Sequence, residues 1–298
     1  MRPGEFAIEP ELVRHLVDTQ FPQWSSEPIQ RVASAGTDNA MFRLGESLVV
    51  RLPRLDSAVD ALVAEQAALP FLDRHVSIQI PEVVAAGLPT PRFGHPWSIY
   101  RWIDGTDAYT ESVANEVGIA AELGTFVREL RSAPPATQQQ SFRGGPLQLR
   151  DEITRRYVQA VTARGELPQR SSTAFWDHAM NLPDWSSEQA WLHADLLPGN
   201  VLIRDGELEA VIDFGGCGLG DPSCDLMAAW ALFTGAARDA FLREGGPDIM
   251  TSRRGRAWAF SVGVGAWEFY QDRNVLLANA GKRAALEALQ SWEDGELG

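Results

Sequence analysis

Residues 191–226, WLHADLLPGNVLIRDGELEAVIDFGGCGLGDPSCDL, decide the fold class of this chain. Two short apolar runs stand on either side of Asp205-Gly206, and an Asp-Gly pair in that place predicts a tight antiparallel hairpin. A hairpin puts Asn200, just before its first strand, beside Asp213, at the end of its second strand. Asp195 lies five residues before Asn200. We therefore expect these three polar side chains to converge at one end of the hairpin.

The three side chains have the chemistry that phosphoryl transfer needs. The oxygens of Asp213 and Asn200 are hard ligands of the kind that Mg²⁺ takes while it keeps water and substrate phosphates. A carboxylate at Asp195 would face the transferred phosphoryl group, where it can orient or deprotonate an acceptor hydroxyl. The spacing thus points to a magnesium–triphosphate site.

The same segment resembles a known family. Residues 193–200 (HADLLPGN), 212–215 (IDFG) and 220–226 (GDPSCDL) are similar to the motifs of the aminoglycoside phosphotransferase family, within the protein-kinase-like superfamily. The resemblance extends over most of the chain, more weakly before residue 40 and after residue 245. It implies an α+β fold of two lobes, with a small N-terminal antiparallel sheet lobe carrying one helix and a larger, mainly helical C-terminal lobe.

The resemblance also implies roles for single residues. Asp195 would be the catalytic carboxylate, Asn200 and Asp213 the Mg²⁺ ligands, and ATP or GTP the co-substrate. Three further residues of the segment are interpreted as structural supports of the catalytic loop: His193, Asp221 and Asp225.

The pattern changes character near residue 104. Before it, alternating runs predict strands over residues 28–34, 40–44, 47–52, 82–86 and 97–103, with a helix over 57–73 that Ser57 would cap. After it, helical periodicity predicts helices over residues 112–131, 148–163, 172–181, 223–244 and 250–274. We therefore divide the chain into a nucleotide-binding lobe, 1–104, and a catalytic and acceptor-binding lobe, 105–298.

Arg51 stands in a strand where the superfamily places a phosphate-binding lysine. The positive charge is kept, but a planar bidentate donor replaces a point charge. Glu65, in the following helix, is the expected ion-pair partner of Arg51, as the family's strand-to-helix pair implies.

Two further segments are expected to touch the nucleotide. Gly36 and Thr37 lie in a turn whose backbone N–H groups would cradle phosphate oxygens. Residues 98–105 resemble the hinge between the lobes of the superfamily, where the backbone of Arg101 and Ile103 would bond to the edge of the base. An ordinary hairpin turn and a plain buried strand explain the same residues.

The acceptor site is expected along the helix over residues 250–274. Trp267, Glu268, Tyr270 and Asp272 are its candidates, and Glu268 and Asp272 share one helical face that would suit an ammonium-rich sugar. The formal net charge of −14 would attract a cationic acceptor. An aminoglycoside-type antibiotic is therefore the expected acceptor, and the solvated-surface explanation of the same charges stays open.

Composition excludes several other classes of protein. The net charge of −14 disfavours binding to nucleic acid, and no apolar run approaches a membrane span. The N-terminus has acids and prolines where a secretory signal would be apolar, and the chain has only two cysteines. We expect a cytoplasmic enzyme with reduced thiols.

Two alternatives share these motifs. A kinase of the same fold that acts on a macrolide, a nucleoside antibiotic, choline or a sugar would have every residue above, although macrolide kinases often have His at the position of Asn200. A nucleotide-binding pseudoenzyme is the other, because Arg51 departs from the family pattern. The complete set of Asp195, Asn200 and Asp213 favours an active enzyme.

Overall fold

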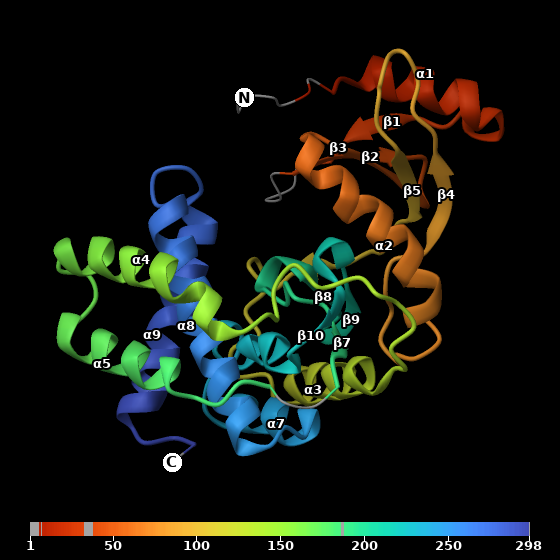
Figure 1. Cartoon of the computed structure of the whole chain (residues 1–298). Helices are drawn as coiled ribbons and strands as arrows, with labels where there is room; N and C mark the ends of the chain where they lie inside the picture. The colour runs from red at the N-terminus through yellow and green to blue at the C-terminus, as the bar shows by residue number, and fades with distance from the viewer. Residues whose placement is uncertain (1–5, 7, 33–37, 186–187, 298) are drawn as a thin grey trace.

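The N-terminal strands form one antiparallel sheet in the order β1-β2-β3-β5-β4 (Figure 1). The computed structural model describes residues 6, 8–32, 38–185 and 188–297. The strands of this sheet are β1 (Ile29–Arg31), β2 (Asn39–Leu44), β3 (Leu48–Pro53), β4 (Val83–Gly87) and β5 (Trp97–Arg101). β3 lies at the centre and is buried along its whole length, so it is the strand best shielded from water.

One helix packs against each face of this sheet. α1 (Pro10–Gln20) was not expected from the sequence; it buries Val13, Leu16 and Val17 in the same apolar cluster as Phe42 of β2. α2 (Val59–Leu72) lies on the other side and carries Glu65. The expected cap at Ser57 is wrong, because residues 56–58 form a 3₁₀ turn that leads into α2.

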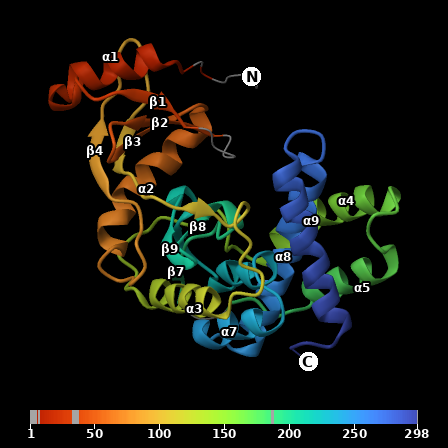
Figure 2. The same cartoon turned by 180° about the vertical axis from the view of Figure 1, so that it is seen from behind.

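Seven helices of the described chain build most of the C-terminal lobe (Figure 2). They are α3 (Val117–Ser132), α4 (Asp151–Ala163), α5 (Gln169–Met180), α6 (Ala228–Ala231), α7 (Gly235–Gly245), α8 (Ile249–Tyr270) and α9 (Val275–Glu293). The expected helix over 223–244 is broken between α6 and α7, where Thr234 bonds to the backbone of Ala114 and Gly235 has a φ of 47°. α9 was not expected.

Two small sheets lie next to these helices. β6 (Thr106–Asp107), β8 (Val201–Arg204) and β9 (Glu207–Val211) form one, and β7 (Ala190–Leu192) pairs with β10 (Gly218–Gly220) in the other. The N–H of Val211 donates to the carbonyl of Gln79 at 3.1 Å, which joins the hairpin to the segment that precedes β4.

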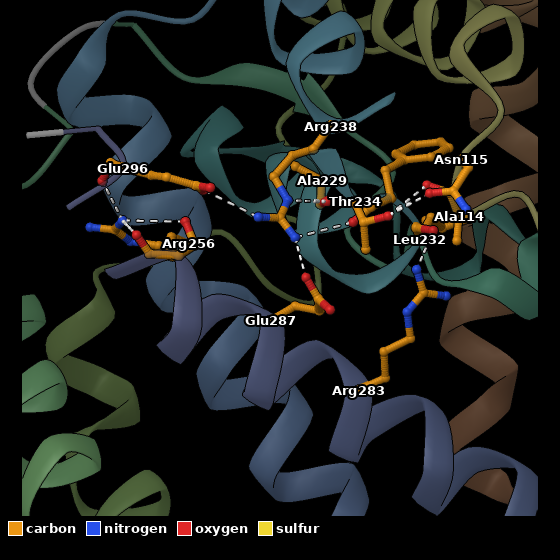
Figure 3. Close-up of polar contacts among 12 residues, drawn as sticks. Ala114, Asn115, Ala229, Leu232, Thr234, Arg238, Arg256, Arg283, Glu287 and Glu296 are labelled. Carbon is orange, nitrogen blue, oxygen red and sulfur yellow. Dashed lines mark hydrogen bonds and ion pairs between the residues drawn. The ribbon is translucent and has the colours of Figure 1, made fainter. Parts of the chain in front are cut away.

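A buried arginine ties the end of the chain to the helical lobe. Figure 3 shows Arg238 of α7 beside Glu287 of α9 and Glu296, and its Nη1 lies 3.2 Å from Glu296 Oε2. Arg256 of α8 donates to the Glu296 carbonyl at 2.6 Å. Glu296 is therefore engaged in packing this lobe.

The described helices can be compared with what a membrane span requires. Among the described residues, none of them combines the length and the apolar character that crossing a bilayer requires.

Candidate active site

The hairpin has the geometry that its sequence predicts. β8 and β9 pair with Val201 opposite Val211, and the turn residues Asp205 and Gly206 have φ of 54° and 81°, the left-handed values of a type I′ turn. The Ile212 N–H donates to the Asn200 carbonyl at 2.9 Å. The open end of the hairpin therefore holds Asn200 next to the residue that precedes Asp213.

Asn200 is turned toward the catalytic loop. Its Nδ2 donates to the backbone carbonyl of Asp195 at 2.8 Å and lies 3.3 Å from Asp195 Oδ2. Because the amide nitrogen faces Asp195, the amide oxygen points elsewhere and is the atom suited to a metal. This donor set fits Mg²⁺, for which Asn200 Oδ1 and the carboxylate of Asp213 would be the protein ligands.

Buried hydrogen bonds hold the catalytic loop in an unusual conformation. Ala194 and Asp213 have φ of 66° and 65°, a left-handed region that costs non-glycine residues free energy. The two oxygens of Asp225 accept the N–H groups of His193 and Ala194 at 2.7 and 2.8 Å. Burial raises the pKa of the Asp225 carboxyl, although these two hydrogen bonds lower it.

His193 links the loop to the hairpin. Its Nε2 lies 2.9 Å from the Ile212 carbonyl, and its Nδ1 accepts the Asp195 N–H at 3.2 Å. Asp221 accepts the Ser223 N–H at 2.9 Å and pairs with Arg254 at 2.7 Å. These contacts agree with the supporting roles inferred from the sequence.

Arg51 joins two carboxylates with the two ends of its guanidinium. Nη1 lies 2.7 Å from Glu65 Oε2, and Nη2 lies 2.8 Å from Asp213 Oδ1. Glu65 is fully buried and also accepts the hydroxyl of Tyr100 at 3.1 Å and the N–H of Phe214 at 2.9 Å. The expected pair with Glu65 is present, and the link to Asp213 was not foreseen.

These ion pairs set the charges of the site. Burial opposes the charge of Arg51, but the carboxylates of Glu65 and Asp213 raise its pKa above the ordinary value. Burial likewise opposes the charge of Asp213, while Arg51 lowers the pKa of that carboxyl. Asp213 is thus held as an anion, which is the form that binds a metal.

Arg143 contacts Asp195 from a distant loop. Its Nη1 donates to the Ala194 carbonyl at 2.9 Å and to Asp195 Oδ1, and its guanidinium lies 4.9 Å from the ring centre of Phe142. Burial opposes its charge, whereas Asp195 raises the pKa of Arg143. One oxygen of Asp195 is therefore occupied by an arginine.

The side chains that carry the proposed chemistry line one cleft between the lobes, with a volume of about 1140 Å³. Arg51, Asp195, Asn200 and Asp213 are among its lining residues. Residues 29–258 match the model of a family described as the phosphotransferase enzyme family.

The chain belongs to this family.

Solved structures of similar fold agree with the family. Wild-type aminoglycoside 2′-phosphotransferase-IIIa in its GDP complex has a TM-score of 0.69 at 20% identity, covering 95% of this chain and 99% of that one. The gentamicin complex of APH(2″)-IIa has 0.62 at 19%, covering 95% and 99%. Macrolide 2′-phosphotransferase MphH from Brachybacterium faecium has 0.63 at 20%, covering 93% and 98%. Among curated proteins, nothing matches.

The chain is thus a small-molecule phosphotransferase with the two-lobed, kinase-like fold expected from its sequence. At these identities, the solved structures establish the fold alone. The family membership rests on the match over residues 29–258.

The hinge of the phosphotransferase lines the cleft through Arg101, Trp102 and Ile103. The Arg101 N–H already donates to the Glu82 carbonyl at 3.0 Å, so its own carbonyl is the group suited to a base. Contact of Arg101 and Ile103 with the base stays a prediction. Gly36 and Thr37 lie outside the described residues.

Three of the acceptor candidates lie on α8, on two different faces. Asp272 lies in the turn after α8 ends at Tyr270, so the expected helical face shared with Glu268 is wrong. Tyr270 lines the cleft, but Trp267, Glu268 and Asp272 are not among its lining residues. Trp267 is buried with Lys282 Nζ 5.0 Å from its ring, and Glu268 pairs with Arg164 at 2.5 Å. Residues 259, 262, 263, 266 and 270 face the cleft at helical spacing, so Glu268 falls on another face.

Sequence reasoning missed the residues of the loop before α4. Arg143 and Arg150 both line the cleft, as does Tyr109, whose ring packs so closely on Gly199 that a Cβ there would lie 2.6 Å from it. A stretch such as SFRGGPLQLR has no motif spacing, and Arg143 is 52 residues from its partner Asp195. Only the fold brings them together.

Proposed function

We propose that this phosphotransferase moves the terminal phosphoryl group of a magnesium-bound nucleoside triphosphate onto a hydroxyl of a small molecule. The observation that carries the proposal is the convergence of Asp195, Asn200 and Asp213 on one cleft that Arg51 also lines. Positioning and electrostatics supply most of the catalysis of such a transfer.

Each residue has a part in the proposed reaction. Asn200 and Asp213 would hold Mg²⁺, which when bound neutralises charge on the phosphates. Asp195, with Oδ1 on Arg143, would orient the acceptor hydroxyl through Oδ2 and accept its proton as the new bond to phosphorus forms. Arg51 would lie at the phosphates, with the Arg101 carbonyl and the Ile103 N–H at the base.

The test is turnover of Mg²⁺-ATP, measured as ADP release with and without acceptor, in Asp195→Asn and Asp213→Asn. We expect a loss of a hundredfold or more in Asp195→Asn, the usual range for a positioned acid–base group, and a loss of Mg²⁺-dependent turnover in Asp213→Asn. Asp205→Asn, an exposed carboxylate in the turn of the same hairpin, is the matched control and should retain full activity. Unchanged turnover in Asp213→Asn would contradict the metal role, and nucleotide binding without turnover in the parent would favour the pseudoenzyme.

For the acceptor, the sequence suggested an aminoglycoside, on the strength of the family and the net charge of −14. A panel of aminoglycosides with Mg²⁺-ATP tests it, and no phosphate transfer to any member would reject that class.

Cytoplasmic location remains part of the proposal, supported by two free, buried cysteines, Cys217 and Cys224.

The lining of the cleft supports a second candidate among the acceptor classes left open above, namely those with little positive charge. Outside the nucleotide side, its carboxylates among the described residues are Asp107 and Asp195. Asp107 accepts the N–H groups of Tyr109 and Thr110 at 3.1 and 3.0 Å, and Asp195 is paired with Arg143. Because few carboxylates face a cationic sugar, an acceptor with little positive charge is the second candidate.

A further inference from the structure

Arg150 is a cation in the cleft that has no carboxylate beside it. It ends the 3₁₀ turn Leu147–Arg150 before α4, and its Nε donates to Ser261 Oγ at 3.1 Å. Ser261 is fully buried on α8 and shares a 2.7 Å hydrogen bond with Thr154 of α4. The Nε end of the guanidinium is therefore anchored to α8 and, through Ser261, to α4. Arg150 also lines the cleft.

The charge on Arg150 is uncompensated within the described part of the chain. Twelve other arginines there have a carboxylate oxygen within 4.0 Å, but no ion pair involves Arg150. Burial lowers the pKa of the Arg150 guanidinium, and the nearby charge of Arg143 adds to this effect. An arginine nonetheless stays protonated, so this part of the cleft carries excess positive charge.

The surroundings of Arg150 are apolar. Phe142, Leu149 and Phe269 line the cleft although 76%, 77% and 43% of their surfaces are exposed. Exposed large apolar side chains gathered at a cleft are typical of a binding surface. Tyr157 and Val262 also line the cleft, and Val262 is buried.

We propose that Arg150 is the recognition residue for an anionic group of the acceptor, so that the acceptor is a hydroxyl compound with an apolar body and a carboxylate or phosphate. The inference rests on the proposed function, because it assigns the substrate class of the same cleft. Arg150 forms charge-assisted hydrogen bonds with the anion, while Phe142, Leu149 and Phe269 cover the apolar body. Asp195 then lies in the same cleft, with Arg143 on one of its oxygens.

The experiment uses three probes of one shape and different charge: benzoate, benzyl alcohol and benzylamine. Their binding to the full-length protein is measured by isothermal titration and saturation-transfer NMR, with Mg²⁺ and a saturating non-hydrolysable ATP analogue. The analogue occupies the nucleotide's own phosphate positions, so the remaining anion binding belongs to the acceptor side. We expect benzoate to bind at least about tenfold more tightly than benzyl alcohol, and benzylamine most weakly.

Variants assign the preference to Arg150. Arg150→Ala should abolish the preference for benzoate. Arg150→Lys should keep part of it, since the positive charge remains but the bidentate donor geometry of the guanidinium is lost. Arg155→Ala removes an exposed arginine of α4 that pairs with Asp151 and Asp177, and it should leave the preference intact. Thermal denaturation of each variant checks that it is folded.

Several outcomes would overturn the inference. They are stronger binding of benzylamine, no binding of benzoate, or an unchanged preference in Arg150→Ala. A preference that exists without the nucleotide analogue and disappears with it would assign Arg150 to the transferred phosphate instead. Titration of the analogue itself is the separate test of the proposed function, since a protein that binds no Mg²⁺-nucleotide fails there first.

Discussion

Arg143 is the residue whose contacts say most about how Asp195, the proposed catalytic carboxylate, is held. It donates hydrogen bonds to Oδ1 of Asp195 and to the carbonyl of Ala194, and Ala194 has a left-handed φ of 66°. A guanidinium that fixes both a side chain and its backbone limits the rotation of the carboxylate. Orientation of the acceptor hydroxyl would then depend on a residue 52 positions away in sequence.

We predict that Arg143→Gly lowers kcat for nucleotide turnover by about ten- to a hundredfold, the equivalent of one or two charge-assisted hydrogen bonds. KM for Mg²⁺-ATP should change little, because Arg51 and the hinge are untouched. Added guanidinium ion should restore part of the rate, which a purely structural defect would not permit. Parent-level turnover in the variant, or a rise in KM alone, would refute the positioning role.

At the scale of elements, α8 and α9 cross at two glycines. A Cβ on Gly281 of α9 would lie 2.6 Å from the Gly263 carbonyl oxygen and 2.7 Å from the Trp267 nitrogen, and these are backbone atoms of α8. The helices can approach this closely only because both side chains are absent. The crossing sets the position of the wall of the cleft that α8 and α9 provide.

Gly281→Ala should therefore destabilise the protein by about 1–3 kcal/mol, the range for overpacking, although alanine is the better helix former. Gly118→Ala in α3 is the matched control, since a Cβ there meets nothing within 4 Å. The control should be neutral or stabilising by up to about 1 kcal/mol. Urea unfolding of both variants measures the difference, and equal effects would show that the crossing is not tight.

The strength of the local sequence signal decided which elements of the fold could be predicted. The hairpin of β8 and β9 was predictable because Asp205-Gly206 is a local signal with one favoured turn type. α9 was missed because its buried face consists largely of small residues, Ala278, Gly281, Ala284, Ala285 and Ala288 among them, and so gives weak hydrophobic periodicity. The break between α6 and α7 depends on a tertiary bond from Thr234 to Ala114, which no local pattern contains.

The candidate site divides in the same way. Asp195, Asn200 and Asp213 were found because they lie within one stretch of nineteen residues around a hairpin. Arg143 and Arg150 were not, because their partners come from other segments and only the fold brings them together. Glu268 was chosen for charge and spacing, but the rotation of α8 about its axis turns it toward Arg164.

At the scale of the whole molecule, the cleft draws its lining from both lobes, so a ligand there stabilises their association. We predict that Mg²⁺ with a non-hydrolysable ATP analogue at a hundred times its Kd adds about 2.7 kcal/mol to the free energy of unfolding. Excess EDTA should remove most of this gain, and Asp213→Asn should bring the remaining gain close to that seen with EDTA. Calorimetric scans measure it, and a gain that is indifferent to EDTA would contradict the metal site.

The double contact of Arg51 has a consequence for the order of events. One guanidinium fastens α2, through Glu65, to the carboxylate of Asp213 at the end of the hairpin. An arriving metal and this arginine would compete for the same anion, so loading the nucleotide would weaken the Arg51–Asp213 contact between the lobes while the Arg51–Glu65 pair within the N-terminal lobe persists. The enzyme would in this way exchange an internal counter-ion for its cofactor without ever leaving Asp213 alone.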